Sequence, residues 1–198
     1  MGRIRRGVLG LVAAALAAGC SLGGERGVQP GSLTPLEWAA LSKPGAAHQL
    51  LSSFVGTWNV KITFWSTPSA PPQESVGSST LTWILGDRFV HEEFQGDVLG
   101  ERYQGLGLMG YDAAARRFTT VWIDSLNTAI AVQQGRYLPE SSTFELRGEV
   151  YDPLIGRNKT TRSEIRVLSP DQYSVRMIDA GPTGADFTSL EIVYTRRS

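Results

Sequence analysis

The residues whose types best suit chemistry are carboxyl groups set among large apolar side chains. Asp124 follows Val121, Trp122 and Ile123, and strand alternation places Asp124 on the same face as Trp122. A carboxyl group in such surroundings can have a raised pKa and serve as a general acid or base. No catalytic residue is predicted outright, but Asp124 and Glu92 are the candidates. The alternative for Asp124 is a buried ion pair with one of three arginines, which are Arg88, Arg162 and Arg176.

Histidine chemistry and metal binding find little support in the sequence. His91, Glu92 and Glu93 are consecutive, but alternation puts at most two of them on one strand face. The other histidine, His48, lies in a predicted helix. A catalytic zinc site needs three protein ligands, so no metal site is expected. We also expect no cofactor, and the alternative left open is a haem bound through His48 or His91.

Neither a dinucleotide nor a nucleic acid is an expected partner. Gly105, Gly107 and Gly110 have the spacing of a dinucleotide-binding loop, but the next strand is predicted to begin near Arg117. That leaves no room for the helix that such a loop requires. Residues 1–19 contain three of the 19 basic residues and none of the 19 acidic ones, so the rest of the chain has a net charge near −3. A nucleic-acid-binding protein would present a strongly basic surface instead.

The N-terminus has the pattern of an export signal. Three arginines within residues 3–6 precede an apolar run over residues 7–18, which is too short to span a bilayer, and Gly19 and Cys20 follow. This ending resembles the lipobox of bacterial lipoproteins, in which the cysteine is acylated and becomes the new N-terminus. We predict a signal peptide at residues 1–19, lipidation of Cys20, and a lipidated tether with a short helix at residues 20–43. The alternative is plain secretion without a lipid.

The expected location follows from this signal. An exported lipoprotein is held on a membrane through its N-terminal lipid. Ser21, the residue after the cysteine, is not an acidic retention residue. In a Gram-negative cell we therefore expect the protein at the outer membrane, facing the periplasm.

From Gly56 onward the sequence alternates between apolar and polar residues with the period of β-strands. Residues rich in turns separate the runs, and the links are too short for crossover helices, so the sheet must be antiparallel. Closure of the sheet would remove its two exposed edges. We predict an all-β domain at residues 44–198, a single antiparallel meander closed as a barrel of about ten strands with one or two short N-terminal helices. The predicted strands cover residues 56–64, 75–85, 88–95, 102–111, 117–125, 129–137, 143–151, 159–168, 172–179 and 186–196.

Two resemblances strengthen this fold prediction. Gly56-Thr57-Trp58 and Arg196 resemble the lipocalin and fatty-acid-binding superfamily, in which a Gly-x-Trp packs beneath an arginine from the final strand. The resemblance implies a Trp58–Arg196 pair at the barrel floor, where a desolvated cation–π contact contributes about 1–2 kcal/mol. The stretches LLSSFVGTW, LGDRF, GLGLMGYD, VWIDS and LEIVYTR resemble the bacterial "domain of unknown function 1579" family. That family implies a small all-β domain, often exported, and no settled activity.

The predicted function is the binding of a small apolar or amphipathic ligand inside the barrel, at the cell envelope. A barrel of about ten strands can enclose more space than its side chains fill. Arg88, Asp124 and Arg176 would fix the ligand's headgroup. One alternative is a filled barrel that binds envelope partners through an apolar patch around Trp65 and Trp83; another is a small-molecule enzyme that uses an interior carboxylate. The predicted lining residues lie on the apolar faces of their strands and are Trp58, Val60, Ile62, Phe64, Trp122, Phe144, Leu146, Tyr173, Val175 and Met177.

Overall fold

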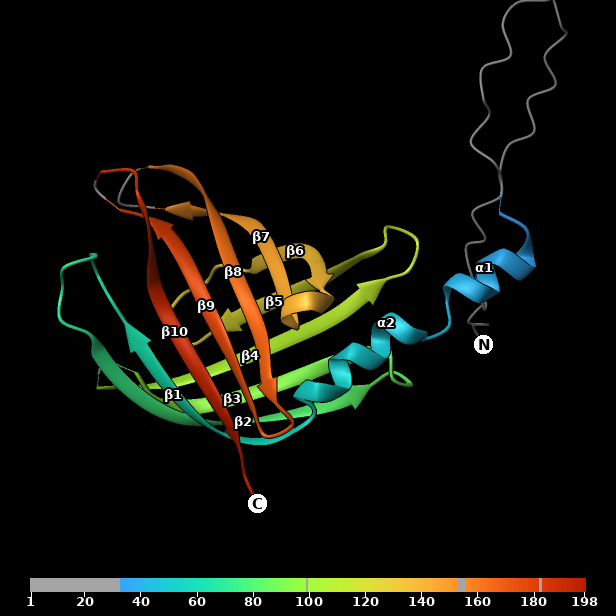
Figure 1. The fold of residues 1–198 in the computed structure, drawn as a ribbon, viewed down its shortest axis with the longest axis horizontal. Coiled ribbons are helices and arrows are strands. Elements are labelled where there is room, and N and C mark those ends of the chain that lie inside the picture. The colour runs from blue at the N-terminus through green and yellow to red at the C-terminus, as the bar shows by residue number, and fades with distance from the viewer. Residues whose placement is uncertain (1–32, 99, 153–155, 182) are drawn as a thin grey trace, which may run out of the picture. The chain divides into compact units, whose positions relative to one another are not determined.

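Ten antiparallel strands follow one another around a closed barrel in the computed structural model (Figure 1). The structure describes residues 33–98, 100–152, 156–181 and 183–198. The predicted signal peptide, the lipidation site Cys20 and the tether up to residue 32 lie outside the described residues. The strands are β1 (Gly56–Phe64), β2 (Gln73–Ile84), β3 (Phe89–Val98), β4 (Glu101–Asp112), β5 (Arg117–Asp124), β6 (Ala131–Leu138), β7 (Thr143–Asp152), β8 (Arg157–Ser169), β9 (Gln172–Ala180) and β10 (Asp186–Arg196).

Pairing between the first and last strands closes the barrel. β1 and β10 are antiparallel neighbours, with a register that runs from Trp58 opposite Arg196 to Phe64 opposite Leu190. Every other strand pairs with the strands before and after it in the sequence. Closure satisfies the backbone groups that a ten-strand meander would leave open at its two edges. The predicted fold class is confirmed.

The strand register decides which side chains point into the barrel. Trp58, Val60 and Ile62 alternate with exposed residues along β1, so these three face inward. Residues directly opposite one another on neighbouring strands share a face, and the register therefore carries this assignment around the sheet. A bulge at Ser189 in β10 and an irregularity near Leu168 in β8 shift the register locally.

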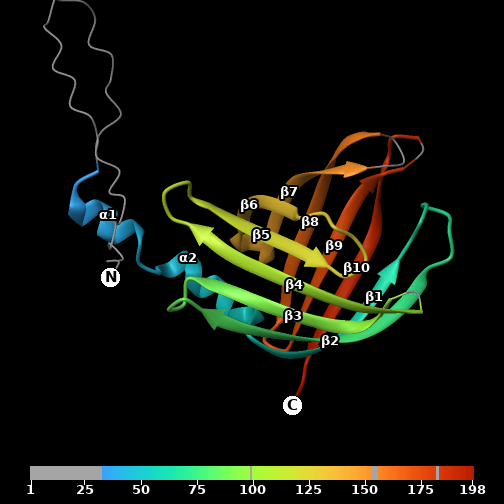
Figure 2. The same ribbon diagram turned by 180° about the vertical axis from the view of Figure 1, so that it is seen from behind.

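A short helical segment covers one end of the barrel, which we call the closed end (Figures 1 and 2). It consists of α2 (Ala46–Gln49) and the 3-10 helix η1 (Leu50–Phe54). Leu51 and Phe54 are almost fully buried there, and the Phe54 ring lies 4.9 Å from Tyr173 and 5.4 Å from Phe144. We call the opposite end the mouth.

One further short helix precedes the barrel strands and another joins two of them. Helix α1 (Pro35–Leu41) begins with a capping box, in which Thr34 and Glu37 satisfy each other's backbone N–H groups. Its apolar residues Leu36 and Trp38 are exposed. The 3-10 helix η2 (Pro139–Ser141) joins β6 to β7. Within the part of the chain that the structure describes, no helix is long and apolar enough to cross a membrane.

Residues Thr34–Ser198 contain all ten strands and the whole hydrophobic cluster. A segment with its own closed sheet and its own core is expected to fold independently. The segment 34–198 is therefore suited to experiments in solution.

Candidate functional site

The floor of the barrel is formed by an arginine stacked on a tryptophan. The guanidinium carbon of Arg196 lies 4.2 Å from the centroid of the Trp58 ring. The Trp58 indole N–H donates a 2.8 Å hydrogen bond to the backbone carbonyl of Phe54, and Arg196 Nη1 donates a 2.8 Å bond to that of Val55. These bonds fasten η1 and the residue after it to the first and last strands, β1 and β10. The closed end is consequently packed and offers no room for a ligand.

Above this floor the interior is less tightly filled. Phe144, Leu146 and Tyr173 face inward at the closed end and are at most 3% exposed. Nearer the mouth, inward-facing residues of β9 and β10 keep part of their surface accessible to water, although the barrel wall surrounds them; they are Val175, Met177, Leu190 and Ile192. The inner face of the barrel near the mouth therefore borders space that water can reach. We call this space the lumen.

A carboxyl group lies deep inside the barrel. Glu92 faces inward on β3 between Val90 and Phe94. Its Oε1 accepts a 2.6 Å hydrogen bond from the Ser79 hydroxyl and a 3.1 Å bond from the Tyr194 hydroxyl. Burial raises the pKa of Glu92, and the bonds from Ser79 and Tyr194 oppose that rise only in part.

The second oxygen of this carboxyl group faces the lumen. Both hydrogen bonds to Glu92 end at Oε1. Among the described residues, no buried side-chain oxygen lacks a hydrogen-bond partner, so Oε2 must keep accessible surface. Glu92 itself retains accessible area although protein encloses it, which agrees with that position. In its neutral form Glu92 would keep its carbonyl oxygen on Ser79 and Tyr194 and turn its O–H toward the lumen.

An aromatic wall lies beside Glu92. The Trp122 ring rests on the bare backbone of β4: a Cβ atom added to Gly105 would lie 2.2 Å from the ring, and one added to Gly107 would lie 3.2 Å from it. The Trp122 indole N–H donates a 2.9 Å hydrogen bond to the Tyr103 hydroxyl. The glycines with dinucleotide-loop spacing therefore make space for a tryptophan, and they lie within a strand as expected.

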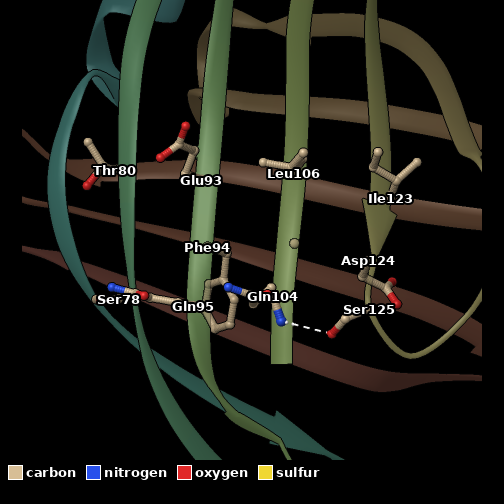
Figure 3. A pocket seen from close by; sticks show the side chains of 11 residues that line it. Ser78, Thr80, Glu93, Phe94, Gln95, Gln104, Leu106, Ile123, Asp124 and Ser125 are labelled. Carbon is tan, nitrogen blue, oxygen red and sulfur yellow. Dashed lines mark hydrogen bonds between the residues drawn. The ribbon is translucent and has the colours of Figure 1, made fainter. Parts of the chain in front are cut away.

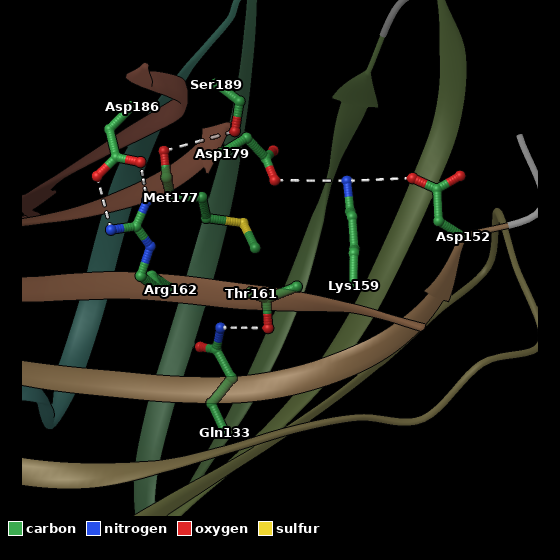
Figure 4. Close-up of polar contacts among 9 residues, drawn as sticks. All are labelled: Gln133, Asp152, Lys159, Thr161, Arg162, Met177, Asp179, Asp186 and Ser189. Atoms are coloured by element: carbon green, nitrogen blue, oxygen red, sulfur yellow. Dashed lines mark hydrogen bonds and ion pairs between the residues drawn. The ribbon is translucent and has the colours of Figure 1, made fainter. Parts of the chain in front are cut away.

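Polar side chains of β6, β7, β8 and β9 face the lumen (Figure 4). Gln133 Nε2 donates a 3.0 Å bond to the Thr161 hydroxyl, which faces inward on β8. Closer to the mouth, Lys159 lies between two carboxylates, with Nζ 3.4 Å from Asp152 and 3.4 Å from Asp179. The lumen is thus lined by apolar side chains in some places and by hydrogen-bonding groups in others.

Asp124 has a role different from the predicted one. Asp124 faces inward at the end of β5, where its Oδ1 accepts hydrogen bonds from the backbone N–H groups of Leu126 and Asn127 at 2.9 and 3.2 Å. The Asn127 side chain also donates to it, at 2.9 Å. Asp124 therefore caps the turn after β5, and the predicted pairing with Arg88, Arg162 or Arg176 is wrong.

The predicted headgroup arginines lie away from the lumen. Arg88 is half-buried in the β2–β3 turn and donates to the backbone carbonyls of Ser42, Leu85 and Gly86. Arg176 is exposed on the outer face, where it contacts Glu164 and the Thr188 hydroxyl. Arg162 pairs with Asp186, also on the outer face. The strand register, which the sequence does not show, puts Arg162 and Arg176 on the outer face, and Arg88 lies in the turn before β3 begins at Phe89.

The remaining predicted lining residues all face inward by the strand register. Trp58, Val60, Phe144, Leu146 and Tyr173 belong to the packed core near the closed end. The others border the lumen or its mouth and are Ile62, Phe64, Trp122, Val175 and Met177. Sequence reasoning found the apolar wall but omitted the polar groups Ser79, Tyr194, Gln133 and Lys159.

One signal in the sequence could have identified Glu92 as interior. Val90 and Phe94 lie two residues before and after it, so all three must share a strand face. An acid flanked in this way on an apolar face is buried by the residues beside it. No comparable signal exists for Tyr194 or Ser79, because their contact with Glu92 depends on closure between distant strands.

Neither histidine faces the lumen. His91 points outward, opposite Leu108 on β4, and lies 4.0 Å from Glu93. His48 is buried at the closed end, where its Nδ1 accepts the Gly45 N–H and its ring packs edge-on against Tyr111. No group of three or more metal-binding side chains occurs among the residues that the structure describes.

Shallow grooves also cross the outer surface. One of about 550 Å³ runs over β2 to β5, and Figure 3 shows Leu106 and Ile123 side by side in it. Another of about 770 Å³ runs over β7 to β10 and includes Trp65 and Arg176. Trp83, in contrast, packs against the core, so the predicted apolar patch around Trp65 and Trp83 is wrong. Neither groove contains an enclosed carboxyl group comparable to Glu92.

The arrangement around Glu92 limits the chemistry that the lumen can perform. Burial also raises the pKa values of Tyr103 and Tyr194, so both hydroxyl groups keep their protons. A carboxyl group that holds its proton and two hydroxyl groups can donate and accept hydrogen bonds. The site is therefore equipped to hold the polar part of a small molecule.

The raised pKa of Glu92 gives the first testable prediction. The ordinary pKa of a glutamate is 4.5, so above pH 4.5 the unfolded chain releases the Glu92 proton while the folded protein keeps it. The free energy of unfolding therefore falls as the pH rises from 4.5 toward the raised pKa of the folded protein. We expect Glu92→Gln to remove this contribution and to raise the free energy of unfolding by about 1–3 kcal/mol at about pH 8, with no gain near pH 4. Urea unfolding of both proteins across this range measures the difference.

Glu93→Gln is the matched control, since Glu93 is the exposed neighbour on the opposite face. Its unfolding curve should follow that of the unchanged protein at every pH. A Glu92→Gln variant whose stability relative to the unchanged protein did not vary with pH would contradict the raised pKa.

Comparison with known proteins places the chain in a family. The sequence profile described as "Protein of unknown function (DUF1579)" matches residues 43–196. No curated protein matches. Among solved structures, the protein in "Crystal Structure of Rv2717c from M. tuberculosis" is similar with a TM-score of 0.56 and 15% identity, over 79% of this chain and 100% of that one. At this identity the similarity shows the fold alone.

Two further solved structures are similar with lower scores. "Structure of a redesigned beta barrel, b11L5F_LGL" has a TM-score of 0.40 and 17% identity, and covers 79% of this chain and 100% of that one. "Structure of EF1p2_mFAP2b bound to DFHBI" has a TM-score of 0.41 and 13% identity, over 76% of this chain and 98% of that one. The family match covers the whole barrel, and the chain belongs to the DUF1579 family of proteins of unknown function.

Proposed function

We propose that the barrel binds a small apolar or amphipathic molecule in its lumen. The observation that carries this proposal is the accessible surface kept by inward-facing side chains, Ile192 and Val175 among them, inside a closed sheet. Natural protein interiors are close-packed. Inward-facing apolar side chains that stay in contact with water destabilise the fold unless a bound molecule fills the space beside them.

The walls of the lumen support an amphipathic occupant. Ile192, Leu190 and Val175 form an apolar side, while Gln133 and Thr161 form a side that hydrogen-bonds. Ligand sites commonly combine a mostly apolar lining with a few fixed polar groups. A molecule with one apolar and one polar face would match both sides.

Native mass spectrometry of segment 34–198, followed by denaturing extraction, tests the proposal directly. We expect a small molecule to co-purify at near-stoichiometric amount. The purified, extracted and refolded protein should also bind the neutral fluorescent probe N-phenyl-1-naphthylamine in a saturable manner, which an emission titration measures.

A variant that fills the lumen makes this test specific. Ile192→Trp places a larger side chain into the space and should weaken probe binding about ten-fold or more, since the probe and the new ring compete for one volume. Thr195→Trp is the matched control, because Thr195 is exposed on the outer face of the same strand. Equal binding by both variants, or no probe binding by the unchanged protein, would contradict a lumen site.

The envelope location is the second part of the proposal. The support is the N-terminal pattern that ends at Cys20. Cys20→Ala in the full chain should remove acylation, so that metabolically supplied radiolabelled palmitate is no longer incorporated. The unchanged protein is expected to carry the label and to fractionate with membranes. An unlabelled unchanged protein would contradict lipidation.

An outer apolar surface favours a second candidate function, an interaction module. Leu106, Leu108, Ile123 and Val132 lie close together on the outer faces of β4, β5 and β6, and each is at least 40% exposed. Exposed apolar patches of this kind commonly mark interaction sites. A clean ligand-free mass and no probe binding would favour this candidate over lumen binding.

A further inference from the structure

The lumen contains an enclosed acid without a basic partner. Oε2 of Glu92 faces the lumen, while Oε1 is held by Ser79 and Tyr194. Among the described residues, no salt bridge joins Glu92 to a lysine, arginine or histidine. An enclosed carboxyl group without a cation is most stable when it is neutral. Glu92 therefore presents a hydrogen-bonding group to the lumen rather than a charge.

Each inward-facing lysine or arginine either contacts other protein groups or lies at the mouth of the barrel. Lys159 is held between Asp152 and Asp179, 3.4 Å from each. Arg196 stacks on Trp58 at the floor and donates to the backbone carbonyls of Ser53, Val55 and Pro170. Arg157, at the start of β8, is exposed. Within the described part of the chain, the register places no other lysine or arginine inside.

The inward-facing acids outnumber these cations. Asp152, Asp179 and Asp124 face inward near the mouth, and Glu101 lies at the exposed start of β4. An anion that entered would leave water, meet no free cation and pass carboxylates on its way. Transfer of an unpaired ionised group out of water is far costlier than transfer of a hydroxyl or amide that finds a hydrogen bond.

We infer that the lumen selects amphiphiles whose polar group is an uncharged oxygen function, a hydroxyl or a carbonyl, and that the carboxyl group of Glu92 holds that group. This inference deepens the proposed function and rests on it. The neutral Glu92 donates its lumen-facing O–H to the ligand oxygen, and Ser79 and Tyr194 keep the carboxyl group oriented. A carboxylate headgroup is excluded because it would bring a charge that no free inward cation among the described residues neutralises. An ammonium headgroup is disfavoured because pairing with it requires Glu92 to ionise where protein encloses it.

Three probes that share one chain separate these headgroups. 1-Octanol, octanoate and octylamine compete for N-phenyl-1-naphthylamine bound to segment 34–198 at about pH 7, where octanoate is an anion and octylamine a cation. We expect 1-octanol to displace the probe at a concentration at least about ten-fold lower than either ion. If either ion competes as well as 1-octanol, the inference is overturned, while probe binding itself still supports the lumen site. If the probe does not bind at all, the proposed function fails first.

Variants of Glu92 test its assigned contact. Glu92→Leu removes the hydrogen-bond donor that faces the lumen. We expect 1-octanol to compete about five- to ten-fold less well, because losing one buried hydrogen bond changes affinity by about that factor. The affinity for the probe should stay within about two-fold. Glu92→Gln keeps a neutral donor facing the lumen and should retain 1-octanol competition within about three-fold. Glu93→Gln, the exposed neighbour, is the surface control. Unchanged 1-octanol competition in a folded Glu92→Leu variant would overturn the assignment, and circular dichroism checks the fold of each.

Discussion

Replacing Trp58 with alanine is expected to lower the free energy of unfolding by about 3–5 kcal/mol. Trp58 is fully buried, and its ring contacts Arg196 at 4.2 Å and the Tyr173 ring at 4.8 Å. The change leaves a large cavity at the closed end. It also removes the hydrogen bond to the Phe54 carbonyl, so a buried acceptor loses its donor. Together these losses should reduce Tm by about 10–15 °C in a domain of this size.

Thermal and urea unfolding of segment 34–198 measure this effect. Trp38→Ala is the matched control, because Trp38 is 66% exposed on α1 and the same atoms are removed there from water rather than from a core. The control should shift Tm by no more than about 1–2 °C. Similar losses for the two variants would mean that Trp58 does not hold the closed end together.

Replacing Gly135 with alanine is expected to have the second-largest effect. A Cβ atom on Gly135 would lie 1.8 Å from the backbone carbonyl oxygen of Glu145, far inside van der Waals contact. A backbone atom cannot swing away as a flexible side chain can, so β6 and β7 must separate where Gly135 pairs with Leu146. We expect a loss of about 2–4 kcal/mol, in the range of overpacked or strained positions.

Gly45→Ala provides the control for Gly135→Ala. An added Cβ at Gly45 meets no atom within 4 Å, and its φ of −130° suits any residue. Its free energy of unfolding should change by less than about 0.5 kcal/mol. A well-tolerated Gly135→Ala would show that β6 and β7 can move apart without cost, and hydrogen exchange of the β6–β7 amides would then show weak protection.

Much of the fold could be predicted from local patterns in the sequence. Alternation along Trp58, Val60 and Ile62 and the turn residues between runs gave ten strands, and short links made them antiparallel. These features act over a few residues, so a single sequence displays them. Strand ends were less well defined: β6 begins at Ala131 rather than residue 129, because backbone pairing rather than residue type ends a ladder.

The candidate site was only half predictable. The apolar wall followed from alternation, but of the two candidate acids Asp124 caps a turn and Glu92 is enclosed in the barrel. Asp124 stands at the end of its strand, where local backbone N–H groups compete for its carboxylate. The choice between two such acids depends on which neighbours enclose them.

The sequence by itself determined the strands, their antiparallel order, the apolar faces and the family of this protein. Tertiary structure alone decided how the polar groups meet: Tyr194 reaches Glu92 across 102 positions of the chain, and Lys159 lies between Asp152 and Asp179 from three different strands. The physical reason is that strand period and turn chemistry are local properties of the chain. The surroundings of a side chain inside a barrel depend instead on register and closure, which bring distant residues together only once every strand has paired.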